Sequence, residues 1–142
     1  LSRLDAANRR HLQAYVRNVH TMEQITRLNT NLRLLKMHQK SGHVAGNRTV
    51  SVELSGLRVG DFVLTTFPGE LTVPVGLNIK RAAKHPHAFV AGYTNGYVHY
   101  APTAEQLKNI GGAQEDSDCM LAPEWQRLYE TRAVQMISRL LR

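Results

Sequence analysis

Two short segments carry residue types that could do chemistry, and each follows a largely apolar run. The first is Phe-Pro-Gly-Glu at positions 67–70, which places the Glu70 carboxylate directly after the run 62–67. The second is Asn-Gly-Tyr-Val-His-Tyr at positions 95–100, which gathers an amide, two phenols and an imidazole after the run 87–93. Strand ends are where α/β folds place ligand-binding side chains, because the sheet holds them rigidly. Glu70 and the segment 95–100 are therefore two candidate functional places.

Each segment also has a plain structural interpretation. Glu70 could be an acid at the start of a helix, where the helix dipole stabilises a negative charge by under about 1 kcal/mol. Tyr97 and Tyr100 could be half-buried packing residues of a loop, with their hydroxyls at the surface. The local sequence leaves both interpretations open for both segments.

The other candidates have less support from their surroundings. His85 and His87 have a spacing that can chelate a metal from a strand, although such pairs are frequent by chance. Cys119 has no nearby histidine in the sequence to activate it, so we do not expect a reactive thiolate. Asp116 and Asp118 lie in a polar segment, and we expect them to face solvent. Glycine-rich phosphate-binding motifs are absent from the sequence.

The elements that must position these residues follow from hydrophobic periodicity. Apolar residues recur every three or four positions from 4 to 37, which predicts an amphipathic helix that ends near Gly42 in a left-handed cap. Alternating or continuous apolar runs predict three strands, at 49–54, 62–67 and 87–93. Further helices are predicted at 71–84, shortly after 103, and from Pro123 to Leu141, with a polar loop at 111–118.

This alternation predicts an α/β fold, with a mixed sheet flanked by helices. We divide the chain into a basic helix (1–40), a strand and helix region that carries the site motifs (49–122) and a C-terminal helix (123–142). A length of 142 residues suits a single unit, but three or four strands make a thin sheet for a finished enzyme domain. The chain also begins Leu-Ser-Arg without a Met. We therefore expect a segment of a larger catalytic domain.

Composition excludes several classes of protein. The single cysteine rules out an intrachain disulfide, and the sequence lacks the run of roughly 18 apolar residues that a membrane-spanning helix needs. The formal charge of +7 is concentrated in residues 1–40, which hold eight basic side chains against two acidic ones. These basic residues are spread along the predicted helix without aromatic interleaving. We expect a solvated or partner-facing helix surface and no nucleic-acid partner.

The site motifs resemble those of the neutral/alkaline (non-lysosomal) ceramidases, and more closely the bacterial ceramidase-like proteins. The resemblance rests on Gly-Asp-Phe at 60–62, Phe-Pro-Gly-Glu-Leu-Thr at 67–72, and Val-Ala-Gly-Tyr-Thr-Asn-Gly-Tyr-Val-His-Tyr-Ala-Pro-Thr at 90–103. It covers most of this chain but only the later part of that family's catalytic domain. The first predicted helix also fits the helical segment that precedes these motifs in the family.

The resemblance implies a zinc-dependent amidohydrolase that uses metal-activated water to cleave the amide of ceramide, a sphingolipid. It implies that Glu70 and Tyr100 are zinc ligands, and that two histidine ligands come from a part of the domain upstream of Leu1. The implied partners are a lipid-like amide substrate and that upstream part of the same domain. The resemblance also implies export in bacteria to the periplasm or the medium, although the residues themselves specify no compartment.

Two departures from the family pattern are visible. None of the seven histidines occupies a position that matches a family ligand. Many relatives also carry a tyrosine after a Gly-Gly pair, whereas Gly111 and Gly112 are followed here by Ala113. Catalytic residues other than the metal ligands are not assigned. We expect the full-length protein to be the enzyme and the isolated chain to be inactive. The alternative is a non-catalytic binding or structural module whose basic helix contacts a partner or an anionic surface.

Overall fold

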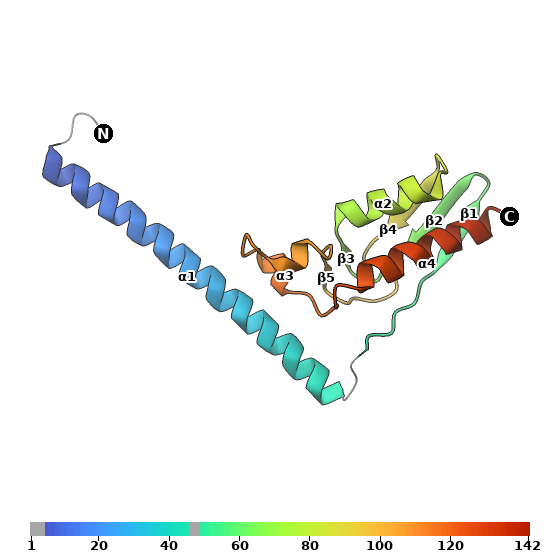
Figure 1. Ribbon diagram of the computed structural model, residues 1–142, viewed down its shortest axis with the longest axis horizontal. Helices are drawn as coiled ribbons and strands as arrows, with labels where there is room; N and C mark the ends of the chain where they lie inside the picture. Colours follow the sequence, from blue (N-terminus) through green and yellow to red (C-terminus); the bar gives the residue numbers. More distant parts are fainter. Residues whose placement is uncertain (1–4, 46–48) are drawn as a thin grey trace.

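The computed structural model describes the backbone of residues 5–45 and 49–142, and the side chains of 5–41 and 49–142. A long N-terminal helix is followed by a small α/β body (Figure 1). In chain order the elements are α1 (Ala6–Ala45), β1 (Gly56–Val59), β2 (Phe62–Thr66), β3 (Glu70–Leu71), α2 (Val73–Ala83), β4 (Ala88–Ala91), β5 (Tyr100–Ala101), the 3₁₀ helix η1 (Gln106–Lys108), α3 (Gln114–Ser117) and α4 (Trp125–Leu140).

The body contains two sheets. The larger has the strand order β1-β2-β4, in which β1 pairs antiparallel and β4 pairs parallel to the central β2. The smaller sheet pairs β3 with β5 in parallel. Helix α2 contacts β4, α4 contacts β1 and β2, and the two helices contact each other, so they form one helical layer against the larger sheet. The predicted α/β class, with a mixed sheet flanked by helices, is confirmed.

The hydrophobic core lies between that helical layer and the sheet. Val63 and Ile79 are fully buried, as is Ile137 on α4. The aromatic rings of Phe67 and Tyr129 meet edge to face with centroids 4.7 Å apart. The Tyr129 hydroxyl, which burial removes from water, donates to the Thr66 carbonyl oxygen at 3.0 Å. The core therefore holds the end of β2, from which the first motif continues.

Helix α1 forms over the predicted segment but leaves most of its apolar residues uncovered. It is anchored to the body by the Asn31 amide, which donates to the Gly112 carbonyl oxygen at 3.1 Å. The helix does not end at Gly42 as predicted but continues to Ala45. A glycine inside a helix costs only about 1 kcal/mol relative to alanine, which the helix-compatible neighbours tolerate. Its exposed apolar residues include Leu12, Tyr15, Val16, Val19, Met22, Ile25, Leu28, Leu32 and Leu35.

Two further expectations differ from the structure. The segment 49–54 forms no strand, and Val50 and Val52 remain exposed on it. The first strand is β1 instead, because the tight turn at Gly60 (φ 58°) returns the chain directly onto β2. The predicted loop 111–118 contains the short helix α3. Within the described part of the chain, the helices lack an apolar stretch long enough to cross a bilayer.

Candidate functional site

The two sequence motifs meet in the small sheet. Glu70 in β3 and Tyr100 in β5 are register partners in the parallel pair. The Glu70 backbone N–H donates to the His99 carbonyl oxygen at 2.9 Å, and the Thr72 N–H donates to the Ala101 carbonyl oxygen at 3.4 Å. The backbone ladder thus places the carboxylate of the first motif beside the last phenol of the second.

Backbone hydrogen bonds also hold the Pro-Gly turn against the second motif. The Val98 N–H donates to the Pro68 carbonyl oxygen at 2.7 Å, and the Tyr93 N–H donates to the Gly69 carbonyl oxygen at 3.0 Å. A Cβ atom at Gly69 would lie 2.7 Å from the His99 carbonyl oxygen, which is fixed in the ladder. The close approach of these two backbone segments therefore requires glycine at position 69.

Three phenols surround the Glu70 carboxylate. The Tyr97 hydroxyl donates a hydrogen bond to Glu70 Oε1, and the hydroxyls of Tyr100 and Tyr93 also hydrogen-bond to this carboxylate. The rings of Tyr93 and Tyr97 stack with centroids 6.3 Å apart. Tyr93 lies outside the six-residue motif and was not among the predicted site residues. Its position at the end of the apolar run 87–93 was the available indication, because strand ends converge on the site.

The phenols and the carboxylate shift one another's pKa values. Desolvation raises the pKa of Glu70, but the hydrogen bonds from Tyr97, Tyr100 and Tyr93 outweigh it, so the net pKa lies below the usual value. The hydrogen bond to Glu70 is the main cause that raises the pKa of Tyr97 to about 12 and that of Tyr100 to about 12. The group is therefore one carboxylate held by neutral phenol donors at neutral pH.

An open pocket of about 320 Å³ adjoins this group. Glu70, Tyr93 and Tyr100 form one part of its lining, and α3 contributes Glu115 and Asp116. Burial, followed by the charge of Glu115, raises the pKa of Asp116. Leu71, Val73 and Pro102 supply apolar walls. The pocket volume lies at the lower end of the range for small-molecule sites, which is roughly 300–1,000 Å³.

The geometry bears on the interpretations that the sequence left open for Glu70 and for Tyr97. Helix α2 begins at Val73 and has no acid in its first turn, so Glu70 is not a helix N-terminal acid. Tyr97 is 52% exposed, so it is not a packing residue, whereas Tyr100 is half-buried. The Tyr97 hydroxyl donates to the Glu70 carboxylate. The two motifs are thus one arrangement of side chains beside a pocket.

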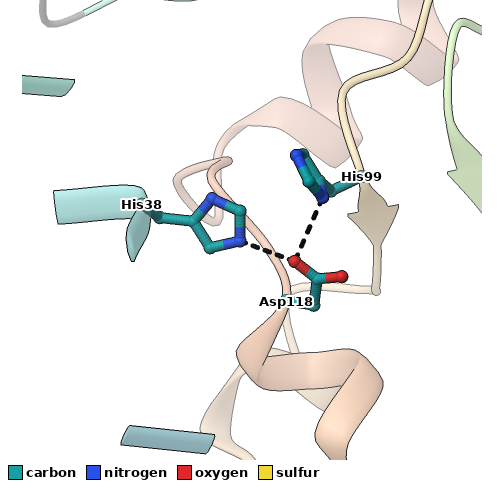
Figure 2. A group of neighbouring side chains, drawn as sticks. All are labelled: His38, His99 and Asp118. Carbon is teal, nitrogen blue, oxygen red and sulfur yellow. Dashed lines mark hydrogen bonds and ion pairs between the residues drawn. The ribbon is translucent and has the colours of Figure 1, made fainter. Parts of the chain in front are cut away.

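A second group of side chains adjoins this one through His99, whose ring centroid lies 5.1 Å from that of Tyr97. Figure 2 shows the group, which consists of His38, His99 and Asp118. Asp118 Oδ1 lies 2.6 Å from His38 Nε2 and 3.1 Å from His99 Nδ1. The expectation that Asp118 faces solvent is wrong, because its side chain is only 18% exposed between the two rings. His38 was not a predicted site residue. It lies 80 positions from Asp118 in the sequence, and only the docking of α1 on the body brings them together.

The remaining candidates have fewer supporting contacts in the described part of the chain. The rings of His85 and His87 are 6.1 Å apart, and the group of three metal-type side chains found among the described residues does not include them. Cys119 is partly buried, and this burial raises its thiol pKa, as expected for an unreactive cysteine. Ala113 is the residue before α3, and its carbonyl oxygen accepts from the Asn109 amide at 3.1 Å.

The zinc that the family resemblance implies can be tested against the donors present. Zinc accepts carboxylate oxygen readily, and a phenol becomes a ligand once a metal lowers its pKa. Glu70 supplies a carboxylate and Tyr100 supplies a phenol, and the two residues lie on paired strands. A zinc site needs about four ligands. Glu70 and Tyr100 therefore have the right chemistry for two of these ligands.

Comparisons with known proteins agree with this fold. No protein-family model matches the sequence, and neither does any curated protein. Among solved structures, a ceramidase complexed with C2 superposes with a TM-score of 0.53 at 28% identity. The neutral ceramidase from Pseudomonas aeruginosa superposes with a TM-score of 0.50 at 23% identity. Each match covers 61% of this chain, which spans only 14% and 15% of the two ceramidase chains. The chain therefore has a ceramidase-like fold that corresponds to part of a larger protein.

Proposed function

We propose that this chain is the later part of the catalytic domain of a zinc-dependent amidohydrolase that resembles neutral ceramidase. Glu70 and Tyr100 would hold the zinc together with two histidines from outside the chain. The observation that carries this proposal is the register pairing of Glu70 with Tyr100 in a sheet beside a pocket. The similarity of the fold to two ceramidase structures supports it.

Zinc, when bound, activates water and polarises the carbonyl of an amide for attack. The chain's own residues prepare the metal-binding end of the pocket. The hydrogen bonds from the phenols keep Glu70 ionised, which a ligand for a cation requires. Tyr97 and Tyr93 would orient the carboxylate through their hydroxyl groups. Ala113 supplies no phenol, so Tyr93 and Tyr97 are the additional hydroxyl donors at this site.

The pocket lining suits an amide that carries an acyl chain. Leu71, Val73 and Pro102 offer apolar surface next to the charged end at Glu70. A ligand with a polar amide and a hydrocarbon chain would place the amide at Glu70 and bury part of the chain against these walls. A lipid-like N-acyl amide is therefore the proposed substrate class.

The test uses the full-length protein and its Glu70→Ala variant. We expect the variant to lose one equivalent of zinc and the hydrolysis of a fluorescent N-acyl amide. Glu53→Ala is the matched control, because Glu53 is exposed and hydrogen-bonds only to the hydroxyl of nearby Ser55 among the contacts described. Zinc content that stays the same in Glu70→Ala would show that Glu70 is not a ligand.

A second candidate function rests on α1. Its exposed apolar residues lie on the same helix as seven basic side chains, which are Arg9, Arg10, Arg17, Arg27, Arg33, Lys36 and Lys40. A non-catalytic module could use this helix to contact a partner or an anionic surface. This function predicts association with anionic vesicles at low salt, weakened by substitution of Arg9, Arg10 and Arg17. Lack of binding at low salt would exclude it.

A further inference from the structure

We propose that His38, His99 and Asp118 form a second metal site, which takes a divalent transition-metal ion such as zinc and fastens α1 to the α/β body. The three side chains come from two separate parts of the chain and converge at one point (Figure 2). Their ligand-type atoms all lie within 4.8 Å of one another. This site is separate from Glu70 and Tyr100 and does not depend on the proposed amidase activity.

Two of the three residues are held by a rigid backbone. His99 and Cys119 form an antiparallel bridge, and the Tyr100 N–H donates to the Asp118 carbonyl oxygen at 3.1 Å. The Asp118 N–H in turn donates to the Gln114 carbonyl oxygen at 3.0 Å, at the end of α3. The His99 carbonyl oxygen is already engaged by Glu70 in the small sheet. The imidazole of His99 and the carboxylate of Asp118 are thus placed next to each other before any ion binds.

The third residue arrives from α1. His38 lies about two helical turns after Asn31, whose amide bond to the Gly112 carbonyl oxygen fixes the helix on the body. The His38 side chain is 7% exposed, and its ring meets that of His99 edge to face with centroids 4.7 Å apart. A buried polar ring needs a polar partner, and Asp118 is that partner here.

The donor set suits zinc. Two imidazole nitrogens and one carboxylate oxygen are common zinc ligands, and a fourth position can hold water. Ligands at roughly 2.0–2.2 Å from one ion are about 3.3–3.6 Å apart in a tetrahedral arrangement. The His38–Asp118 contact of 2.6 Å would open by less than about 1 Å to admit the ion. His99 is 28% exposed, which leaves a path from solvent.

A hydrogen-bonded clamp without an ion is the competing interpretation of the same contacts. Both interpretations dock α1 on the body, so loss of stability in a variant does not separate them. Metal affinity does, because the side-chain amide that Asp118→Asn introduces still accepts a hydrogen bond from His38 but is a poor zinc ligand. The clamp predicts that this variant and the parent chain bind no zinc.

The experiment titrates the 142-residue chain with Zn²⁺ by calorimetry, and with Co²⁺ to record the absorption bands of a tetrahedral site. We expect one ion per chain, with affinity lowered at least about tenfold by Asp118→Asn or His38→Gln. Asp61→Asn and His11→Gln are the matched controls, since both side chains are exposed and Asp61 lies in the β1–β2 turn. Far-UV circular dichroism checks that each variant folds.

Imidazole nitrogen NMR of the unaltered chain gives a second readout that needs no variant. Zinc should shift the ring nitrogens of His38 and His99 and leave those of the other histidines in place. Absence of saturable binding would overturn the proposal. Unchanged affinity in Asp118→Asn would overturn it too. Affinity lost in Glu70→Gln and kept in Asp118→Asn would place the ion at the Glu70 carboxylate and also contradict it.

Discussion

Glu70 and Tyr100 face each other as register partners across the β3–β5 pair, and the hydroxyl of Tyr100 hydrogen-bonds to the Glu70 carboxylate. The carboxylate and the phenol therefore titrate as a linked pair. Each holds the other in the state that suits a hydrogen bond, the acid ionised and the phenol neutral. The consequences can be measured on the 142-residue chain without any metal.

Removing the charge at position 70 should lower the pKa values of the neighbouring phenols. In the parent chain the pKa values of Tyr97 and Tyr100 are about 12. In Glu70→Gln we expect both to move toward the ordinary value near 10. Spectrophotometric titration of phenolate absorbance, or NMR of labelled tyrosine rings, measures the change. Glu53→Gln serves as control, and an unchanged alkaline titration in Glu70→Gln would show that the carboxylate does not hold these phenols.

Acid should remove the contribution of Glu70 to stability. Its pKa in the folded chain is lowered below 4.5, so the folded state binds this proton less readily than the unfolded state. The stabilisation is present above the unfolded value and disappears as the pH falls through the folded value. We expect urea unfolding to show Glu70→Gln less stable than the parent chain at about pH 7, with the difference shrinking as the pH falls through the lowered pKa of Glu70 in the folded chain. A difference that grows in acid would contradict the sign of the shift.

Gly69→Ala should separate the two motifs. The added methyl group would lie 2.7 Å from the His99 carbonyl oxygen, a backbone atom that cannot rotate away. We expect a loss of stability of roughly 1–3 kcal/mol and a partial return of the Tyr97 pKa toward its usual value. Gly76→Ala is the control, because nothing apart from the chain neighbours and the nearby backbone of α2 lies within 4 Å of its added methyl group. That substitution should stabilise the helix by roughly 0.5–1 kcal/mol.

The core beneath the site should be sensitive to truncation of α4. Ile137 is fully buried against the sheet, whereas Leu128 on the same helix is 62% exposed. Ile137→Ala should lower the free energy of unfolding by about 2–5 kcal/mol, through lost apolar burial and the cavity left behind. Leu128→Ala should change it by no more than about 0.5 kcal/mol. Chemical denaturation of both variants measures the two values, and similar losses would show that α4 packs by another face.

Much of the fold follows from local patterns. The strand at 62–67, the helix at 71–84 and the final helix are apolar segments whose periodicity predicts their structure, and each is found close to its predicted bounds. The predicted strand 49–54 fails for a non-local reason. It alternates correctly, but the turn at Gly60 gives β1 the place next to β2. Alternation of apolar and polar residues shows that a segment can pair in a sheet. It does not show which strand the segment will pair with.

The candidate site, too, could be predicted only in part from local sequence. Glu70 and the segment 95–100 could be singled out because chemistry-bearing residues follow apolar runs. That Tyr93 joins them depends on the backbone bond from its N–H to the Gly69 carbonyl oxygen, which local sequence does not reveal. The meeting of His38 with Asp118 depends on the docking of a separate helix. Such tertiary contacts between distant segments leave no periodic trace in the chain.

Helix α1 is attached to the body by side-chain hydrogen bonds from one part of its length. Asn31 and His38 hold the helix to the body, and its N-terminal half projects away from it (Figure 1). At about 1.5 Å per residue, the arm from Ala6 to Asn31 is roughly 37 Å long, so a tilt of about 5° at the anchor sweeps its tip through about 3 Å. The exposed apolar residues on this arm, such as Tyr15 and Met22, would move with it.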